Sequence, residues 1–157
     1  MVKKLKYILI MAFVLIVAAC TTMQPIDNIG QQTVPNGLTG DQVRQSILSA
    51  CGLMGYKADE ASPGTVLVTI STGDEQTAKV KISYDNSGYS LLYVSSQNIE
   101  QQNGQISEEY NNWVKSLNNA IQNQLNQASS RTVMGGPSDT SNNTTVISKE
   151  KQPKSGS

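Results

Sequence analysis

Three segments in the middle of the chain carry an apolar residue at every second position. They cover residues 65–72, 77–84 and 89–95. A period of two is typical of β-strands that bury only one face. A shorter strand is expected at 56–61, and turn-forming residues such as Pro63-Gly64 separate the segments. The pattern therefore predicts an antiparallel meander of three or four strands.

Two flanking segments have their apolar residues at helical spacing instead. Thr39 and Gln42 fit a capping box at the start of the first helix, and Gly55 fits its end. The second helix begins near Ser107. We expect an α+β fold, a two-layer sandwich in the order α-β-β-β-β-α, with both helices on one face of the sheet. The helical stripes consist of Val43, Ile47, Ala50, Cys51 and Met54 in the first helix and Tyr110, Trp113, Val114, Leu117, Ile121 and Leu125 in the second.

Composition divides the chain into an organised middle and polar flanks. Every aromatic residue after position 20 lies between Tyr56 and Trp113. The segment before the first helix contains Pro and Gly without any period, and the C-terminal segment is rich in Ser, Thr and Asn. The expected parts are a signal peptide at 1–19, a flexible tether at 20–38, an α+β domain at 39–127 and a disordered tail at 128–157.

The N-terminal segment has the three parts of a bacterial lipoprotein signal peptide. Three lysines precede an apolar run at 7–19, and Ala18-Ala19 lead into Cys20. The run is shorter than the roughly 20 residues that a membrane-spanning helix needs. We therefore expect a lipid on the Cys20 sulfur and cleavage before it. The alternative is an uncleaved membrane anchor.

The residue after the cysteine indicates the membrane to which such a lipoprotein is sorted. Thr21 follows Cys20, where an acidic residue would favour retention in the inner membrane of a Gram-negative bacterium. If the source is such an organism, the expected location is the cell envelope, lipid-anchored in the outer membrane and facing the periplasm.

Composition also excludes several classes of chemistry. The chain has no histidine, which removes Ser–His, Cys–His and histidine-based zinc sites. Cleavage before Cys20 would leave nine basic and twelve acidic side chains, a formal net charge of −3, so nucleic acid is not an expected partner. We expect no cofactor and no metal site.

The chain contains a second cysteine, Cys51, besides Cys20. With Cys20 acylated, Cys51 has no partner for an intramolecular disulfide. A small buried apolar side chain is the expected role of Cys51. A reactive thiol and an intermolecular link are the alternatives.

Four segments, taken in order, resemble a known type of protein. The first two are the helix end at Gly55-Tyr56 and the Pro63-Gly64 turn. The other two segments are more specific together. One is 80–98, which begins with Val80-Lys81-Ile82-Ser83-Tyr84. The other is 106–117, which contains Tyr110-Asn111-Asn112-Trp113-Val114. Together they make residues 39–125 similar to a family of small, functionally uncharacterised bacterial lipoproteins. The resemblance implies a lipid-anchored envelope domain and assigns no activity.

One candidate binding site lies around the predicted connection from the sheet to the last helix. Its members are Ser96, Asn98, Tyr110 and Asn111, whose hydroxyl and amide groups suit a peptide or a glycan. The alternative is that Ser96 and Asn98 stabilise turns and that Tyr110 belongs to the core.

A second candidate is the face of the sheet turned away from the helices. Leu67, Leu92 and Val94 are expected there, among threonines and the lysines at 79 and 81. An uncovered apolar patch with a polar rim is typical of a partner surface. Isolated surface residues, or coverage by the tether, are the alternatives.

These observations favour a non-enzymatic, lipid-anchored envelope protein that binds another envelope protein and meets the membrane through its N-terminal lipid. The alternative is a module that binds a small ligand or a glycan through the loops around Asn98 and Tyr110. An enzyme is the least supported class, because no motif or oxyanion-forming turn accompanies the serines and lysines of the strands.

Overall fold

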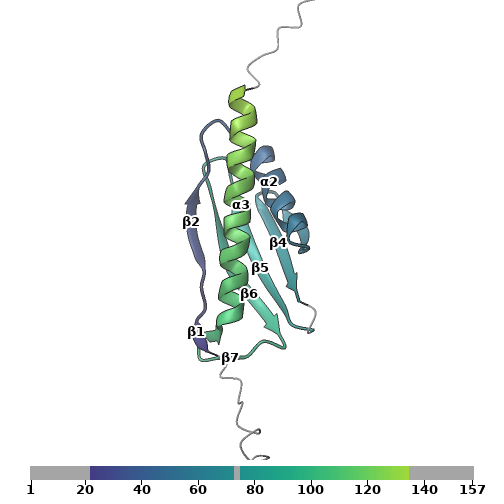
Figure 1. Ribbon diagram of the computed structural model, residues 1–157, viewed down its shortest axis with the longest axis vertical. Helices are drawn as coiled ribbons and strands as arrows, with labels where there is room; N and C mark the ends of the chain where they lie inside the picture. The colour runs from purple at the N-terminus through teal and green to yellow at the C-terminus, as the bar shows by residue number, and fades with distance from the viewer. Residues whose placement is uncertain (1–21, 73–74, 135–157) are drawn as a thin grey trace, which may run out of the picture.

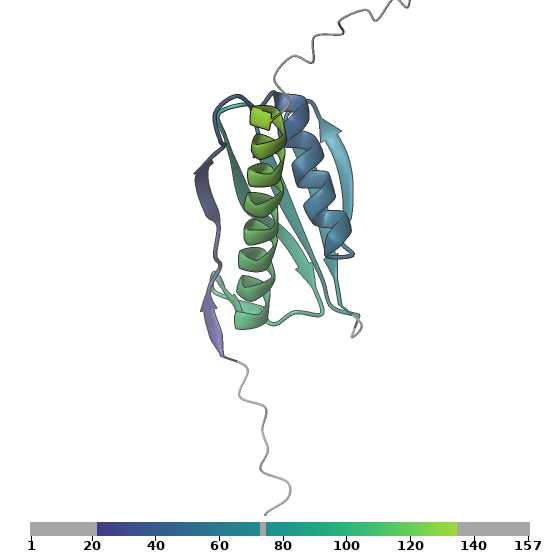
Figure 2. The same ribbon diagram turned by 45° about the horizontal axis from the view of Figure 1, so that its top comes forward.

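The computed structural model describes residues 22–72 and 75–134, which form two layers (Figure 1). One layer is a five-stranded antiparallel sheet in the order β2-β6-β5-β4-β3. The other layer consists of α2 (Gly40–Leu53) and α3 (Glu108–Met134), which lie next to each other on one face of the sheet (Figure 2). The strands are β2 (Ile29–Thr33), β3 (Lys57–Ser62), β4 (Thr65–Ser71), β5 (Thr77–Tyr84) and β6 (Gly88–Gln97).

A second, smaller sheet closes one end of the molecule. It has the order β1-β8-β7 and lies at the start of α3 (Figure 1). Its strands are β1 (Met23–Pro25), β7 (Gln101–Gln102) and β8 (Gln105–Ser107). The α+β class and the placement of both helices on one sheet face are therefore confirmed, with more strands than the expected meander.

The first helix starts at the expected capping box. The Thr39 hydroxyl accepts a hydrogen bond from the Gln42 amide at 3.3 Å, and the Gln42 side chain accepts one from the Thr39 amide at 2.8 Å. Both helices bury their apolar stripes, although Met54 and Trp113 are only half-buried. Among the described residues, no helix is long and apolar enough to cross a membrane.

The alternation of the central strands decides which face of the sheet is buried. Every second residue of β4, β5 and the first half of β6 points toward the helices and is almost fully buried. These residues are Val66, Val68, Ile70, Ala78, Val80, Ile82, Tyr89 and Leu91. The residues between them point to the opposite face. Burial of one face against the helices is the main apolar contribution to the fold.

The expected flexible tether at 20–38 is wrong for the described residues from 22 onward. β1 pairs with β8, and β2 pairs with the edge of the main sheet at β6. Val34 and Leu38, which follow β2, are buried in the core. The segment lacks a period because its order comes from backbone pairing with distant strands, which needs few apolar side chains.

Gly88 explains how β2 approaches β6 so closely. A Cβ atom at this position would lie 2.7 Å from the carbonyl oxygen of Gln32, closer than van der Waals contact allows. Only glycine leaves room for the backbone of β2 here.

The expected disordered tail at 128–157 is wrong for residues 128–134, because α3 continues to Met134. Ala128 packs against the core, and the Thr132 hydroxyl accepts a hydrogen bond from the Gln42 side chain of α2 at 3.3 Å. Contacts with α2 therefore extend the helix beyond its apolar stripe. The predicted signal peptide, Cys20 and residues 135–157 lie outside the described residues.

Substitution of two neighbouring leucines of β6 tests which face of the sheet is buried, because the two side chains point to opposite faces. Leu91 is fully buried and Leu92 is 38% exposed. We expect Leu91→Ala to lower the free energy of unfolding by about 2–5 kcal/mol. The matched control Leu92→Ala should change it by no more than about 0.5 kcal/mol. Urea denaturation of both variants measures the difference, and equal losses would contradict the assignment of the two faces.

Candidate functional site

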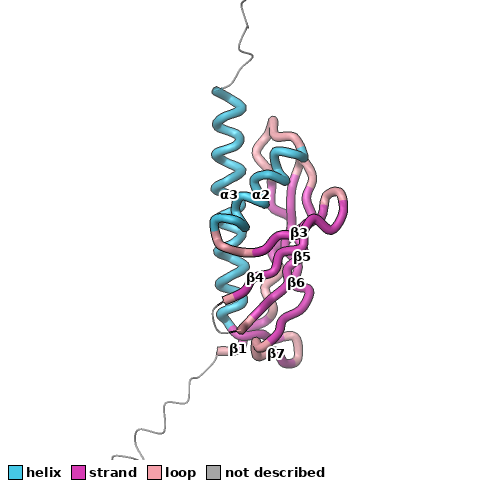
Figure 3. The backbone as a smooth tube through the Cα atoms, turned by 90° about the vertical axis from the view of Figure 1, so that its right-hand side faces the viewer, coloured by secondary structure: helices cyan, strands magenta, loops and turns pink. Residues whose placement is uncertain are grey.

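The sheet has an outer face that is turned away from α2 and α3 (Figure 3). The three apolar residues expected on this face, Leu67, Leu92 and Val94, are exposed or half-buried. Leu67 of β4 lies opposite Lys81 of β5, and Lys81 lies opposite Leu92 of β6. Leu92 and Val94 are 38% and 49% exposed, and Leu67 is half-buried. We call Leu67, Lys81, Leu92 and Val94 the outer patch. The two leucines therefore lie on either side of Lys81, and Val94 follows two residues after Leu92 on β6.

Lysine side chains give the outer patch its charge. Paired residues on adjacent strands have Cβ atoms about 5 Å apart, so the Lys81 stem lies between the two leucines. Such a stem covers apolar surface while its ammonium group stays in water. Lys79 lies one step further along β5, opposite Thr69. Among the residues that the structure describes, neither lysine forms an ion pair with a carboxylate.

The edge of the same face is neutral by comparison. Lys57 of β3 forms an ion pair with Asp59 at 3.3 Å. These residues lie opposite Thr69 and Leu67, so they border the outer patch. Within the described part of the chain, the positive charge that has no carboxylate partner on this face therefore lies on the central strand β5.

A β-bulge explains why Val94 is so exposed. Val80 pairs with Tyr93 and Lys79 pairs with Ser95, so Val94 is an extra residue in β6. Beyond the bulge, Ser96 pairs with the buried Ala78 and lies on the helix side of the sheet. The alternation of the sequence shows no sign of the bulge, because the extra residue is itself apolar.

The polar candidates near the start of α3 serve the fold. Asn111 is 2% exposed and holds the N-terminal segment in place. Its Nδ2 donates to the carbonyl of Pro25 at 2.9 Å, and its Oδ1 accepts from the amide of Asp27 at 3.0 Å. Both ends of the amide group are thus used within the protein.

Asn98 and Ser96 form hydrogen bonds within the fold, although not the local turn bonds that the alternative interpretation expected. Asn98 has a left-handed backbone, with a φ of 56°, and donates to the carbonyl of Glu75 at 3.1 Å. Asn tolerates this conformation better than most residues. The Ser96 hydroxyl lies 2.9 Å from the hydroxyl of Tyr93.

Tyr110 belongs to the core. Its ring is fully buried and meets the ring of Tyr93 edge-on, with the centroids 5.3 Å apart. Burial raises the pKa of the Tyr110 hydroxyl well above its usual value, so the group stays neutral. The polar groups of Ser96, Asn98 and Asn111 are therefore engaged within the fold, and Tyr110 is part of the core.

An open cleft at the other end of the sheet was not expected from the sequence. It has a volume of about 910 Å³ and is lined by the start of α2 and two strand turns. Arg44 lies in this cleft and forms ion pairs with Glu60 and with Asp41, so its charge is compensated. The only sequence signal was an arginine outside the apolar stripe of the helix. Its partner Glu60 is brought near by the tertiary fold.

Cys51 is a buried core residue, as expected. Its side chain is fully inside the protein, and burial raises the pKa of the thiol to about 11. A neutral, inaccessible thiol is a poor nucleophile. In residues 22–72 and 75–134, no three acidic or cysteine side chains cluster as a metal site would require.

Comparisons with protein-family models, with curated proteins and with solved structures gave no match to this chain.

Adjacent asparagines at the start of α3 test the role of Asn111. We expect Asn111→Ala to lower the free energy of unfolding by about 1–3 kcal/mol, because two partly buried hydrogen bonds to the backbone of Pro25 and Asp27 are lost. Hydrogen exchange should accelerate selectively in residues 22–33. The control Asn112→Ala changes an exposed side chain and should have no effect. A ligand-binding role, without a structural one, would leave both variants equally stable.

Proposed function

We propose that this protein is a non-enzymatic, lipid-anchored lipoprotein of the bacterial cell envelope that binds another envelope protein through the outer patch. The observation that carries this proposal is the exposure of Leu92 and Val94, with the half-buried Leu67 nearby, on a sheet face that no described helix covers. Exposed apolar groups surrounded by polar ones are favourable to bury in an interface.

The charge of the patch indicates the chemistry of the partner. Lys79 and Lys81 present two ammonium groups without a carboxylate partner among the described residues. A complementary surface has apolar side chains facing the two leucines and carboxylates facing the lysines. Exposed charge pairs of this kind mainly affect the association rate and are screened by salt. We therefore expect association to slow as the ionic strength rises.

Lipid attachment at Cys20 supports a role that depends on contact. A single acyl chain gives only marginal membrane binding, whereas two or three chains hold a protein firmly. A protein held at the membrane meets partners in the same layer at a high effective concentration. A weak patch of a few residues then suffices for association.

The alternative function, binding of a small ligand or a glycan near Asn98 and Tyr110, gains no support from the geometry. The amide groups of Asn98 and Asn111 are engaged with backbone groups of the fold. Tyr110 is fully buried.

Photo-crosslinking in the native host tests the outer patch. A photo-reactive amino acid at position 92 should crosslink to one specific envelope protein. The same probe at position 53 is the control, because Leu53 is 74% exposed but lies at the end of α2, away from the patch. Lys81→Glu should weaken binding of the captured protein about tenfold or more, the loss typical of an interface hot spot. Identical crosslinks from both positions, or unchanged affinity of the Lys81→Glu variant, would refute the proposal.

Mass spectrometry of protein from the native host tests the anchor. We expect an N-terminal peptide that starts at residue 20 and carries the mass of acyl chains. The variant Cys20→Ser should not be processed in this way, since lipid attachment requires the sulfur. A free thiol at position 20, or a retained leader, would rule out the lipoprotein assignment.

A further inference from the structure

The first described residues are fixed to the body of the protein. The carbonyl of Thr22 accepts a hydrogen bond from the amide of Glu108 at 2.9 Å, at the start of α3. Met23–Pro25 pairs with Gln105–Ser107 along its whole length. The amide of Ile26 donates to the carbonyl of Gly104 at 3.1 Å.

The attachment continues along the segment between the two sheets. Asn111 binds the backbone at Pro25 and Asp27, as described above. The Asn28 side chain accepts a hydrogen bond from the amide of Tyr93 at 2.8 Å. The N-terminal segment is thus held by two sheets and by two asparagine side chains.

This attachment limits the distance between the lipid and the folded domain. Cys20 precedes Thr22 by two residues, and consecutive Cα atoms are about 3.8 Å apart, so the two Cα atoms are within about 8 Å of each other. We infer that the domain stands upright on the bilayer, with the end formed by β1, β7, β8 and the first turn of α3 against the lipid surface. This inference rests on the proposed acylation of Cys20.

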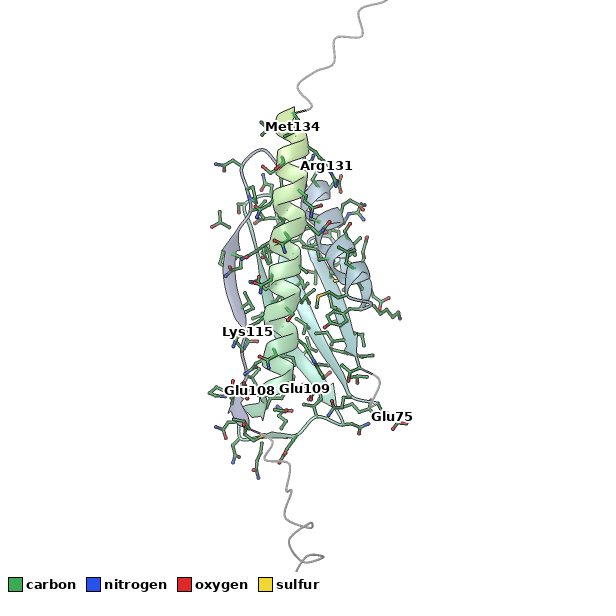
Figure 4. The ribbon with its side chains drawn as sticks, viewed as in Figure 1. Glu75, Glu108, Glu109, Lys115, Arg131 and Met134 are labelled. Carbon is green, nitrogen blue, oxygen red and sulfur yellow. The ribbon has the colours of Figure 1, made fainter. Side chains whose placement is uncertain are left out.

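The shape of the domain determines what lies far from the membrane. α3 runs along the long axis, with Glu108 and Glu109 at one end and Arg131 and Met134 at the other (Figure 4). Its 27 residues span about 40 Å at a rise of 1.5 Å per residue. The strands of the main sheet follow the same axis (Figure 1). The outer patch therefore faces sideways, where it is accessible to a partner in the same membrane.

A competing explanation for the upright orientation is that this end of the domain is attracted to anionic lipid. The charges at this end disfavour that explanation. Glu75, Glu108 and Glu109 lie at the membrane-facing end (Figure 4). Lys115 is the nearest labelled base, and it forms an ion pair with Asp27 at 3.5 Å. Anionic headgroups attract basic clusters and repel carboxylates. The short connection to the lipid, rather than attraction of this end to headgroups, therefore determines the upright orientation.

A second orientation is available to a lipid-anchored domain with basic residues on its side. Lys79 and Lys81 would attract the outer face of the sheet to an anionic bilayer, and the domain would then lie flat. The attachment of Thr22 to Glu108 opposes this orientation, because it places the lipid at the end of the long axis.

Fluorescence quenching in vesicles distinguishes these orientations. The lipidated full-length protein is reconstituted into phosphatidylethanolamine–phosphatidylglycerol vesicles that carry a nitroxide on the headgroup. A fluorophore is attached to single variants Gln102→Cys, Ser95→Cys or Met134→Cys, which represent the proposed membrane-facing end, the sheet face and the distal end. Wild-type protein is the labelling blank, because Cys51 is fully buried. Quenching at position 102 should exceed quenching at position 134 several-fold, with position 95 in between.

A lengthened connection is the matched control. Insertion of about 15 Gly and Ser residues between Thr21 and Thr22 adds an average reach of roughly 20 Å and should remove the difference between the ends. Equal quenching at positions 102 and 134 in the unmodified protein would overturn the inference. Strongest quenching at position 95 would also overturn it, in favour of the flat orientation.

The experiment separates this inference from the proposal on which it rests. If the protein floats with the vesicles but shows no difference between its ends, the upright orientation fails and lipid anchoring stands. If the protein does not float and its N-terminal peptide is unmodified, both fail together.

Discussion

Alternating side chains in β4, β5 and β6 make one face of the sheet apolar, and that face has to be covered by the two helices. Val66, Val80 and Leu91 represent the buried rows on the sheet side, and Ile47 and Leu117 represent the helical stripes that meet them. Because both helices lie on the same face, no helix among the described residues covers the opposite face. The exposed patch is thus a direct consequence of the way in which the core is buried.

The N-terminal segment depends on this two-layer body but is held by a different kind of interaction. Its backbone groups pair with β6 and β8, and Asn111 satisfies two more of them. Such pairing needs an unoccupied strand edge and a glycine that permits close approach, which Gly88 provides. The result is a chain that enters the fold at one end of the long axis, directly after the proposed lipid site. Residues at the start of α3 therefore hold the segment that directly follows the proposed lipid site.

The two candidate sites had different outcomes for the same physical reason. The polar residues around Asn98 and Asn111 lie where loops and strand ends leave backbone groups without ladder partners, so their side chains bind those groups. The residues of the outer patch lie in the middle of regular strands, where the ladder already satisfies the backbone. Leu92 and Lys81 are therefore free to contact a partner, whereas Asn111 is not.

Local periodicity in the sequence determined both helices, the four strands of the meander and the residues on each face, because each of these elements buries a stripe that repeats with its own geometry. It also placed Leu67, Leu92 and Val94 on one surface. Only the tertiary structure decided that residues 22–38 join the sheets, that β6 contains a bulge at Val94 and that α3 continues to Met134. These features come from hydrogen bonds between residues far apart in the chain, and such bonds leave no repeating pattern in the amino-acid sequence.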